Sequence, residues 1–389
     1  MLLILLLASA FVGPYLFLFA AKLHFIRFVP LVSILIYSNR KFRMNPKLKL
    51  YLIYFSIYFC YTLVISLVRL DSIRGTDVFN FFVLYFFVIS VALYSSLDFI
   101  KFQKYLFSFL VLFLLAALVF SIYEEVTLNH LSYSAMLVEP KKWPERHFPT
   151  MFFTNSNDLA AIVVLSVMYI LSALPMKKNG IIMKLIIIVL SAWICFVAES
   201  KLAFLVLLIF VFFYLRLWVF HRYIIAAILF VIIFSVAVDP QIILKVENSL
   251  FNFSMDEGGS TFERLAVYKY GLYSVIESYG LGLGVGASQI YYMALVGNGL
   301  SGITIDPHSY LVELLISSGP IIFGAYVLFN VYLLVALIKS GANYLHILQL
   351  GLYHLVLFSS SSSVFLWPHY IFFISYLHFE NDRISTTVK

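Results

Sequence analysis

His308 is the residue in this sequence best suited to move a proton. It follows Asp306-Pro307 directly, where a new apolar helix is expected to begin. Proline suits the first turn of a helix, so His308 would be held at a defined helix start. Because the ordinary pKa of histidine lies close to neutrality, His308 is a candidate general base. A polar residue that caps a membrane helix at the interface is the alternative interpretation.

Lys201 and Arg264 are candidate anion-binding residues. Lys201 interrupts a long apolar stretch, where a charge marks a functional site unless a hairpin tip carries it to the lipid headgroups. Glu199, two residues earlier, would not share a helix face with Lys201. Arg264 lies in the first turn of an expected helix, and a cation together with a helix N-terminus attracts an anion such as phosphate. Snorkelling at the membrane interface would explain Arg264 equally well.

A third polar segment, residues 153–160, leads into an apolar helix. Asn157 or Ser156 is expected to cap this helix, with Asp158 in its first turn, where a negative charge is favourable. Capping alone accounts for these residues. Support of a nearby site by Asn155 and Asn157 is the second interpretation.

Residues 239–307 form the longest segment without a spanning pattern, and such a loop is uncommon between membrane helices unless it binds or catalyses. Ser260-Thr261-Phe262-Glu263 fits a capping box, and apolar residues follow at helical spacing. The pattern predicts an amphipathic helix at the membrane interface. Its expected apolar face comprises Leu265, Tyr268, Leu272, Val275 and Tyr279.

The glycine-rich run 280–286 superficially matches a dinucleotide fingerprint, but it follows a helix rather than a strand. Its glycines are expected to allow tight turns or close approach of helices. The histidines have no ligand spacing with one another, and the sequence has no Walker loop and no G-x-S-x-G elbow. We therefore expect neither a metal nor a cofactor.

The composition is that of an all-α polytopic membrane protein. Of 389 residues 63% are hydrophobic and 12% are charged, whereas soluble domains have about 25% charged residues. The net charge of +7 is attributed to basic loops that set topology rather than to nucleic-acid binding. Cys60 and Cys195 lie inside apolar runs and are expected to be small buried side chains, not a disulfide or metal pair.

Apolar runs predict about twelve spans. They are residues 1–21, 23–38, 50–68, 78–97, 105–123, 157–174, 185–198, 201–217, 223–238, 309–338, 345–358 and 364–379. The first run lacks the features of a cleaved signal and is interpreted as a span. Basic residues favour the cytoplasmic side, which places both termini inside and residues 69–77, 124–153 and 239–307 outside.

Four segments, in this order, resemble the bacterial O-antigen ligase and O-antigen polymerase superfamily of membrane glycosyltransferases. They are residues 153–160, Ser200-Lys201, the segment from Ser260-Thr261-Phe262-Glu263-Arg264 to Gly286, and Asp306-Pro307-His308-Ser309-Tyr310-Leu311 with Ser318-Gly319-Pro320. The resemblance covers residues 152–337. Lys201 stands where the family usually has Arg, so a point charge replaces a bidentate fork, and Ser309 stands where it usually has Asn.

The resemblance implies a GT-C-like fold and a metal-independent transfer outside the cytoplasmic membrane of a bacterial cell. The donor would be a glycan on undecaprenyl pyrophosphate, and a hydroxyl of a glycan or lipid acceptor would displace the pyrophosphate. Arg264 and Lys201 would bind the pyrophosphate, and His308 would accept the proton or orient the hydroxyl. Ser309, Asn155 and Asn157 are candidate supporting residues. Membrane lipids and a chain-length regulator are the further partners expected.

The sequence leaves several functions open. We prefer a polymerase that joins repeat units of an O-antigen, capsule or exopolysaccharide, with a ligase as a close alternative. A transporter or flippase for lipid-linked sugars would need polar residues through the whole bilayer, and few lie in mid-span beyond Glu313. On this interpretation the chain divides into N-terminal spans (1–150), a core with the external loop (151–340), and C-terminal spans with a short cytoplasmic tail (341–389).

Overall fold

The structure is a computed structural model. It describes residues 2–11, 17–18, 21–22, 28–37, 40, 44–69, 75–130, 148–153, 155–173, 181–215, 260–297, 309–359 and 366–378. In the first half the elements are α1 (Leu2–Phe11), β1 (Phe17–Leu18), β2 (Ala21–Lys22), α2 (Val29–Tyr37), α3 (Pro46–Val68), α4 (Gly75–Leu97), α5 (Phe99–Thr127) and α7 (Ser156–Ala173). They are followed by α8 (Ile181–Val197), α9 (Lys201–Tyr214), α12 (Ser260–Glu277), α13 (Ala287–Gly297), α14 (Tyr310–Lys339), α15 (Tyr344–Ser359) and α16 (Pro368–Leu377).

The helices form a bundle whose composition suits a multi-pass membrane protein. Five of them, α3, α4, α5, α7 and α14, are long and apolar enough to cross a bilayer, and α1, α8, α9 and α15 are shorter apolar helices. Large apolar side chains such as Leu112 of α5, Val189 of α8 and Leu328 of α14 are exposed on the outside of the bundle. The prediction of an all-α fold is confirmed for the described residues, apart from the two-residue strands β1 and β2.

The prediction of one span over residues 1–21 is wrong. Helix α1 ends at Phe11, and Phe17–Leu18 then pairs antiparallel with Ala21–Lys22. Pro14 follows the end of α1 by three residues, and a proline neither donates a backbone hydrogen bond nor fits a helix interior. Cys60 is exposed, whereas Cys195 is buried as expected. The span expected at 223–238 lies outside the described residues.

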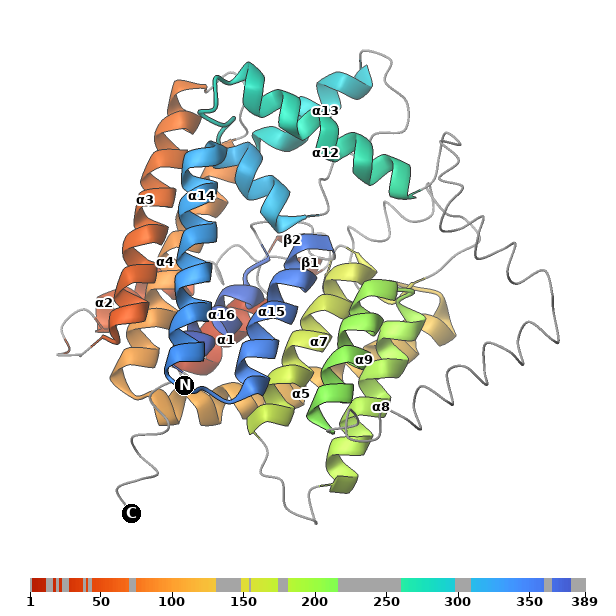
Figure 1. Ribbon diagram of the computed structural model, residues 1–389. Helices are drawn as coiled ribbons and strands as arrows, with labels where there is room; N and C mark the ends of the chain where they lie inside the picture. Colours follow the sequence, from red (N-terminus) through yellow and green to blue (C-terminus); the bar gives the residue numbers. More distant parts are fainter. Residues whose placement is uncertain are drawn as a thin grey trace.

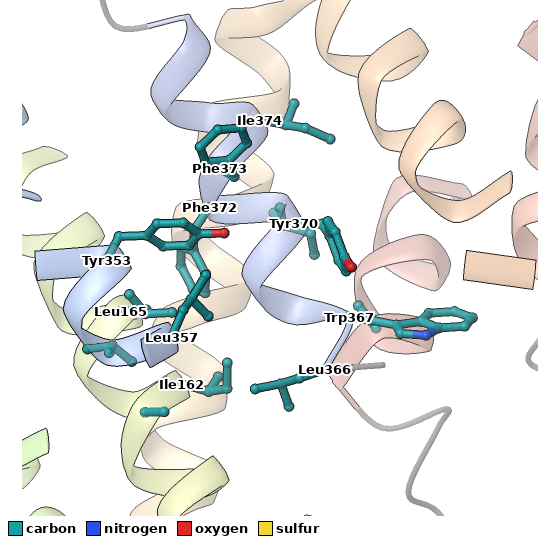
Figure 2. Packing of buried hydrophobic residues seen from close by; sticks show 14 of the residues in the cluster. Ile162, Leu165, Tyr353, Leu357, Leu366, Trp367, Tyr370, Phe372, Phe373 and Ile374 are labelled. Carbon is teal, nitrogen blue, oxygen red and sulfur yellow. The ribbon is translucent and has the colours of Figure 1, made fainter. Parts of the chain in front are cut away.

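Helix α16 lies at the centre of the bundle. All ten of its residues are buried, among them Tyr370, Phe373 and Ile374, and it contacts α1, α3, α4 and α7. Figure 2 shows the side chains of α16 beside Ile162 and Leu165 of α7. A helix of this composition has no polar face to turn outward, so burial on all sides is its favourable position.

The bundle core holds more polar groups than the sequence suggested. Tyr353 of α15 hydrogen-bonds His369 of α16 at 2.9 Å, and Tyr326 of α14 lies 3.4 Å from His354 of α15. The expectation of few mid-span polar residues beyond Glu313 was therefore wrong. Glu313 itself lies in the first turn of α14, because this helix begins at Tyr310.

The two ends of the bundle differ in what joins the helices. At the end that we call the basic end, Asn45 before α3 donates to the carbonyl of Leu377 in α16, and Tyr344 of α15 donates to the carbonyl of Phe213 in α9. Lys47 and Lys339 also lie there, in the first turn of α3 and the last turn of α14. At the opposite end, the loop end, α12 and α13 lie across the helices (Figure 1).

Candidate functional site

A glycine loop, residues 278–286, binds the first part of α14 at a kink. The backbone N–H groups of Leu283 and Gly284 donate to the carbonyls of Ile316 and Ser317 at 2.8 and 3.0 Å. In a straight helix the residue at position 320 would donate to Ile316, but Pro320 has no N–H. The loop therefore supplies hydrogen bonds that the kink removes, and it fixes where the first turns of α14 lie.

The same loop is held by α3 from its other side. Ser66 accepts a hydrogen bond from the N–H of Val285 at 3.0 Å, and Tyr61 donates to the carbonyl of Leu281 at 3.0 Å. Gly282 has a φ of +83°, and a Cβ atom there would lie 2.7 Å from the carbonyl oxygen of Ser317. The prediction that these glycines allow tight turns and close approach is confirmed.

Helix α12 lies on α14 with a face of small residues. A Cβ atom at Gly271 would lie 2.6 Å from Ile316 of α14, and the buried neighbours on this face include Val267 and Ser274. Leu272 and Tyr279, two residues of the expected apolar face, are 55% and 93% exposed. Because α12 and α14 approach closely at Gly271, large side chains are excluded from the contact between them. The placement of the apolar face at the membrane interface stays a prediction.

Helix α13 packs against α12. Tyr292 donates to the carbonyl of Val267 at 2.8 Å. Burial, and then the charge and hydrogen bond of the Glu277 carboxylate, raise the pKa of Tyr291 to about 12. The phenol of Tyr291 is therefore protonated at neutral pH and can donate to Glu277.

Lys201 lines a cavity of about 540 Å³ at the loop end. It is the first residue of α9. The other end of α9 lies at the basic end, where the carbonyl of Phe213 accepts the hydrogen bond from Tyr344. The lining comprises Glu125, Phe148, Cys195, Phe196, Val197, Glu199, Ser200, Lys201 and Phe204. Ser200 is the N-cap of α9 but makes no side-chain capping hydrogen bond, so the cation stands beside a helix N-terminus that Ser200 does not cap.

The turn between α8 and α9 brings Glu199 into the same cavity. The N–H of Ser200 donates to the carbonyl of Cys195 at 3.2 Å, and that of Glu199 donates to Phe196 at 3.0 Å. These are the two hydrogen bonds of a Schellman motif, and Glu199 is its left-handed residue with a φ of 48°. The helix-face argument that separated Glu199 from Lys201 does not apply, because Glu199 lies in the turn rather than in a helix.

Sequence reasoning missed Glu124 at the end of α5. Its buried carboxylate accepts hydrogen bonds from the backbone N–H groups of Thr150 and Met151, at 2.5 and 3.1 Å, and lies 3.8 Å from His130. These bonds fix the segment that enters α7, next to the cavity that Glu125 lines. A partner 26 residues away leaves no local sequence signal.

The cap of α7 is Asn155 and not Asn157 or Ser156. The side-chain oxygen of Asn155 accepts a hydrogen bond from the backbone N–H of Asp158 at 2.8 Å, and the side-chain NH₂ of Asn155 donates to the Asp158 carboxylate at 3.0 Å. Ser156 is already the first residue of the helix, whereas a capping residue must precede the first helical residue. Capping accounts for Asn155, and Asn157 lies half-buried in the first turn of α7.

Of the remaining predicted site residues, Ser309 and Arg264 belong to elements at the loop end. Ser309 caps α14 by accepting from the N–H of Val312 at 3.4 Å, and His308, which precedes it, lies outside the described residues. Arg264 belongs to α12, one turn before Tyr268, whose ring lies 6.1 Å from that of Phe358 near the end of α15. Convergence of the three basic side chains on one cavity stays a prediction.

Metal binding has no structural support in the part of the chain that the structure describes. No group of three or more His, Cys, Asp or Glu side chains there is arranged to hold a metal ion.

Comparison with known proteins bears on the segment that holds Lys201, Arg264 and His308. Residues 186–329 match the O-antigen ligase family, Wzy_C. This segment of the chain is similar to the O-antigen ligase family. The chain is also 23% identical over 237 residues to the teichuronic acid biosynthesis protein TuaE of Bacillus subtilis (strain 168). The alignment covers 57% of this chain and 47% of TuaE, so the chain spans about half the length of this relative.

The resemblance to the O-antigen ligase and polymerase superfamily is thus confirmed. The matched residues run from within α8 to within α14 and include both the turn between α8 and α9 and the glycine loop. Residues 153–160, which were part of the predicted resemblance, precede the matched segment.

Proposed function

We propose that this protein is a membrane glycosyltransferase of cell-envelope polysaccharide biosynthesis. It takes a glycan from an undecaprenyl pyrophosphate carrier and transfers it to an acceptor hydroxyl outside the cytoplasmic membrane. The observation that carries this proposal is Lys201, a cation at the start of α9, in the wall of a cavity of about 540 Å³ within the family segment. A cavity of this size is within the range that holds a ligand of several sugar or phosphate units.

The pyrophosphate is the group that this cavity wall suits. The N-terminus of α9 and the ammonium group of Lys201 both favour an anion, and their charges would stabilise the negative charge that develops on the leaving pyrophosphate. Arg264 in α12 supplies the second cation, and His308 accepts the proton of the attacking hydroxyl. The pyrophosphate is already a leaving group, so the transfer uses no nucleotide.

We favour polymerisation, with transfer of a finished glycan to a lipid or wall acceptor as the second reaction. The family description favours the ligase reaction, whereas the relative is named for the biosynthesis of teichuronic acid. Transport of a lipid-linked sugar is the third possibility, since buried polar groups such as His354 and His369 lie within the core.

Reconstitution separates these reactions. The purified protein is incorporated into vesicles with a polyprenyl-pyrophosphate glycan, and the products are separated on a gel. A ladder of lengths supports a polymerase, a single transferred unit supports a ligase, and movement of intact donor across the bilayer without transfer would contradict both.

The same assay tests the basic residues. Arg264→Ala and His308→Ala should each remove transfer, while Arg264→Lys should restore part of it, because lysine keeps the charge and loses the fork. Lys201→Arg should be active, since the family usually has Arg there. Protein that inserts normally and transfers at the unaltered rate after Arg264→Ala or His308→Ala would remove that residue from the site.

A further inference from the structure

We propose that Glu199 is a sugar-binding residue of this site. Its carboxylate accepts hydrogen bonds from hydroxyl groups of the sugar ring attached to the diphosphate. This inference rests on the proposed function and adds a specificity-determining residue to it. Three observations carry the inference: the backbone conformation of Glu199, its place in the cavity wall, and the charge of its neighbour Lys201.

The backbone conformation of Glu199 favours glycine. A Schellman motif needs a left-handed residue, and a side chain with a Cβ atom is strained there. The α14–α15 turn has the same two hydrogen bonds, from Ala342 to Leu337 and from Gly341 to Ile338, and it has glycine at the left-handed position. A glutamate that is kept where the turn prefers glycine indicates a use for its side chain.

The place of Glu199 in the cavity indicates what that use is. Glu199 lies two residues from Lys201, and Glu125 of α5 adds a second carboxylate to the lining. Carboxylates repel a diphosphate, so Glu199 and Glu125 do not bind the diphosphate group itself. A sugar ring presents hydroxyl groups, which donate to a carboxylate in charge-assisted hydrogen bonds, and apolar C–H groups, which pack against Phe148 and Phe204 in the same wall.

The arrangement divides the cavity between two parts of one ligand. Lys201 at the start of α9 faces the diphosphate, and Glu199 in the preceding turn faces the first sugar. The two residues are separated by Ser200 alone, so they can contact two neighbouring parts of one ligand, the diphosphate and the first sugar. Removal of Glu199 should therefore weaken recognition of the sugar and leave recognition of the lipid diphosphate intact.

The test compares Glu199→Gly and Glu199→Gln with the unaltered protein in reconstituted vesicles. Glu199→Gly relieves the strained turn, so its thermal unfolding temperature in detergent should rise while the transfer rate falls at least ten-fold. Glu199→Gln retains the strained turn and should raise the KM for the glycan donor. Inhibition by sugar-free undecaprenyl pyrophosphate should stay within two-fold in both variants, whereas Lys201→Ala should weaken this inhibition.

Gly341→Glu is the matched control. Gly341 is the left-handed residue of the same motif at the end of α14, at the basic end, and it does not line the cavity. This variant should unfold at a lower temperature, because it introduces the strain that Glu199→Gly removes, but its transfer rate should be unchanged. If Glu199→Gly transfers as fast as the unaltered protein, Glu199 has no role in sugar binding. If the unaltered protein itself transfers nothing from the lipid-linked glycan, the proposed function fails, and this inference fails with it.

Discussion

The turn between α14 and α15, at the basic end, has Gly341 at its left-handed position, whereas the turn between α8 and α9, at the loop end, has Glu199 there. Both turns are closed by the same pair of backbone hydrogen bonds. The requirement for a left-handed residue is therefore the same at both ends. Only the loop end meets it with a residue that is strained in this conformation.

The contrast extends beyond this pair of turns. Among the described residues, the non-glycine residues with positive φ are Leu128, Met151, Glu199 and Tyr279. All of them follow helix ends or enter helices at the loop end, where Lys201 and the start of α14 also lie. Backbone strain tends to persist where function depends on a defined geometry. The distribution of strain thus agrees with a site at the loop end.

The largest loss of stability is expected for a substitution at the kink of α14. The glycine loop binds α14 there and fixes where its first turns lie. Gly319 has a φ of 73° and a ψ of 173°, a conformation that is almost restricted to glycine, and an added Cβ atom would clash with the carbonyl of Gly280. Gly319→Ala should cost more than about 3 kcal/mol, because backbone strain and the clash add. Thermal unfolding in detergent measures the loss, and proteolysis should become faster at residues 278–286.

Gly324→Ala on the same helix is the control for this prediction. Five residues beyond the kink, Gly324 has no atom within 4 Å of an added Cβ and no positive φ. Alanine is favoured over glycine in a helix by about 1 kcal/mol, so this variant should be as stable as the unaltered protein or more stable. Equal effects of Gly319→Ala and Gly324→Ala would show that the glycine loop does not fix the start of α14.

Two acidic residues at opposite ends of α5, Glu124 and Asp98, provide a comparison in which effects of intermediate size are expected. Glu124 at the loop end is buried and accepts two backbone N–H groups from a distant segment, whereas Asp98 at the basic end is exposed and caps its own helix through Lys101. Glu124→Ala should cost about 2 to 3 kcal/mol, since two buried donors lose their acceptor. Asp98→Ala should cost about 1 kcal/mol.

Activity separates these variants further. Loss of Glu124 releases the segment that enters α7 beside the cavity, so Glu124→Ala should also reduce transfer, whereas Asp98→Ala should leave it unchanged. Both quantities come from the same preparations, through unfolding in detergent and transfer after reconstitution. A Glu124→Ala protein that retains full transfer would separate the α7 entry from the site.

The sequence predicted what depends on local composition. Apolar runs located most helices to within a few residues, and the order of short motifs indicated the superfamily segment that residues 186–329 match. The start of α12 at Ser260 and the role of the glycines also followed from residue types. These features depend on neighbouring residues in the chain, so they can be predicted without knowledge of contacts between distant segments.

What the sequence could not give depends on contacts between distant segments. The face of α12 that contacts α14 is set by the approach of Ile316 to Gly271, and hydropathy gives no signal of this contact. Glu124 is defined by partners 26 and 27 residues away, and Glu199 was set aside because a helix was assumed where there is a turn. The roles of His308, Arg264 and Lys201 stay predictions.

The smallest effect tests the comparison of the two turns directly. Gly341→Glu places at the basic end the residue that the loop end carries, and it should lower the free energy of unfolding by about 1 kcal/mol, the cost of a left-handed non-glycine residue. Glu199→Gly should raise it by a similar amount. If strain is tolerated at the loop end for function alone, Gly341→Glu should leave transfer unchanged. If the Gly341→Glu protein is as stable as the unaltered chain, a left-handed glutamate does not lower the free energy of unfolding of this bundle. The backbone conformation of Glu199 would then need no functional explanation.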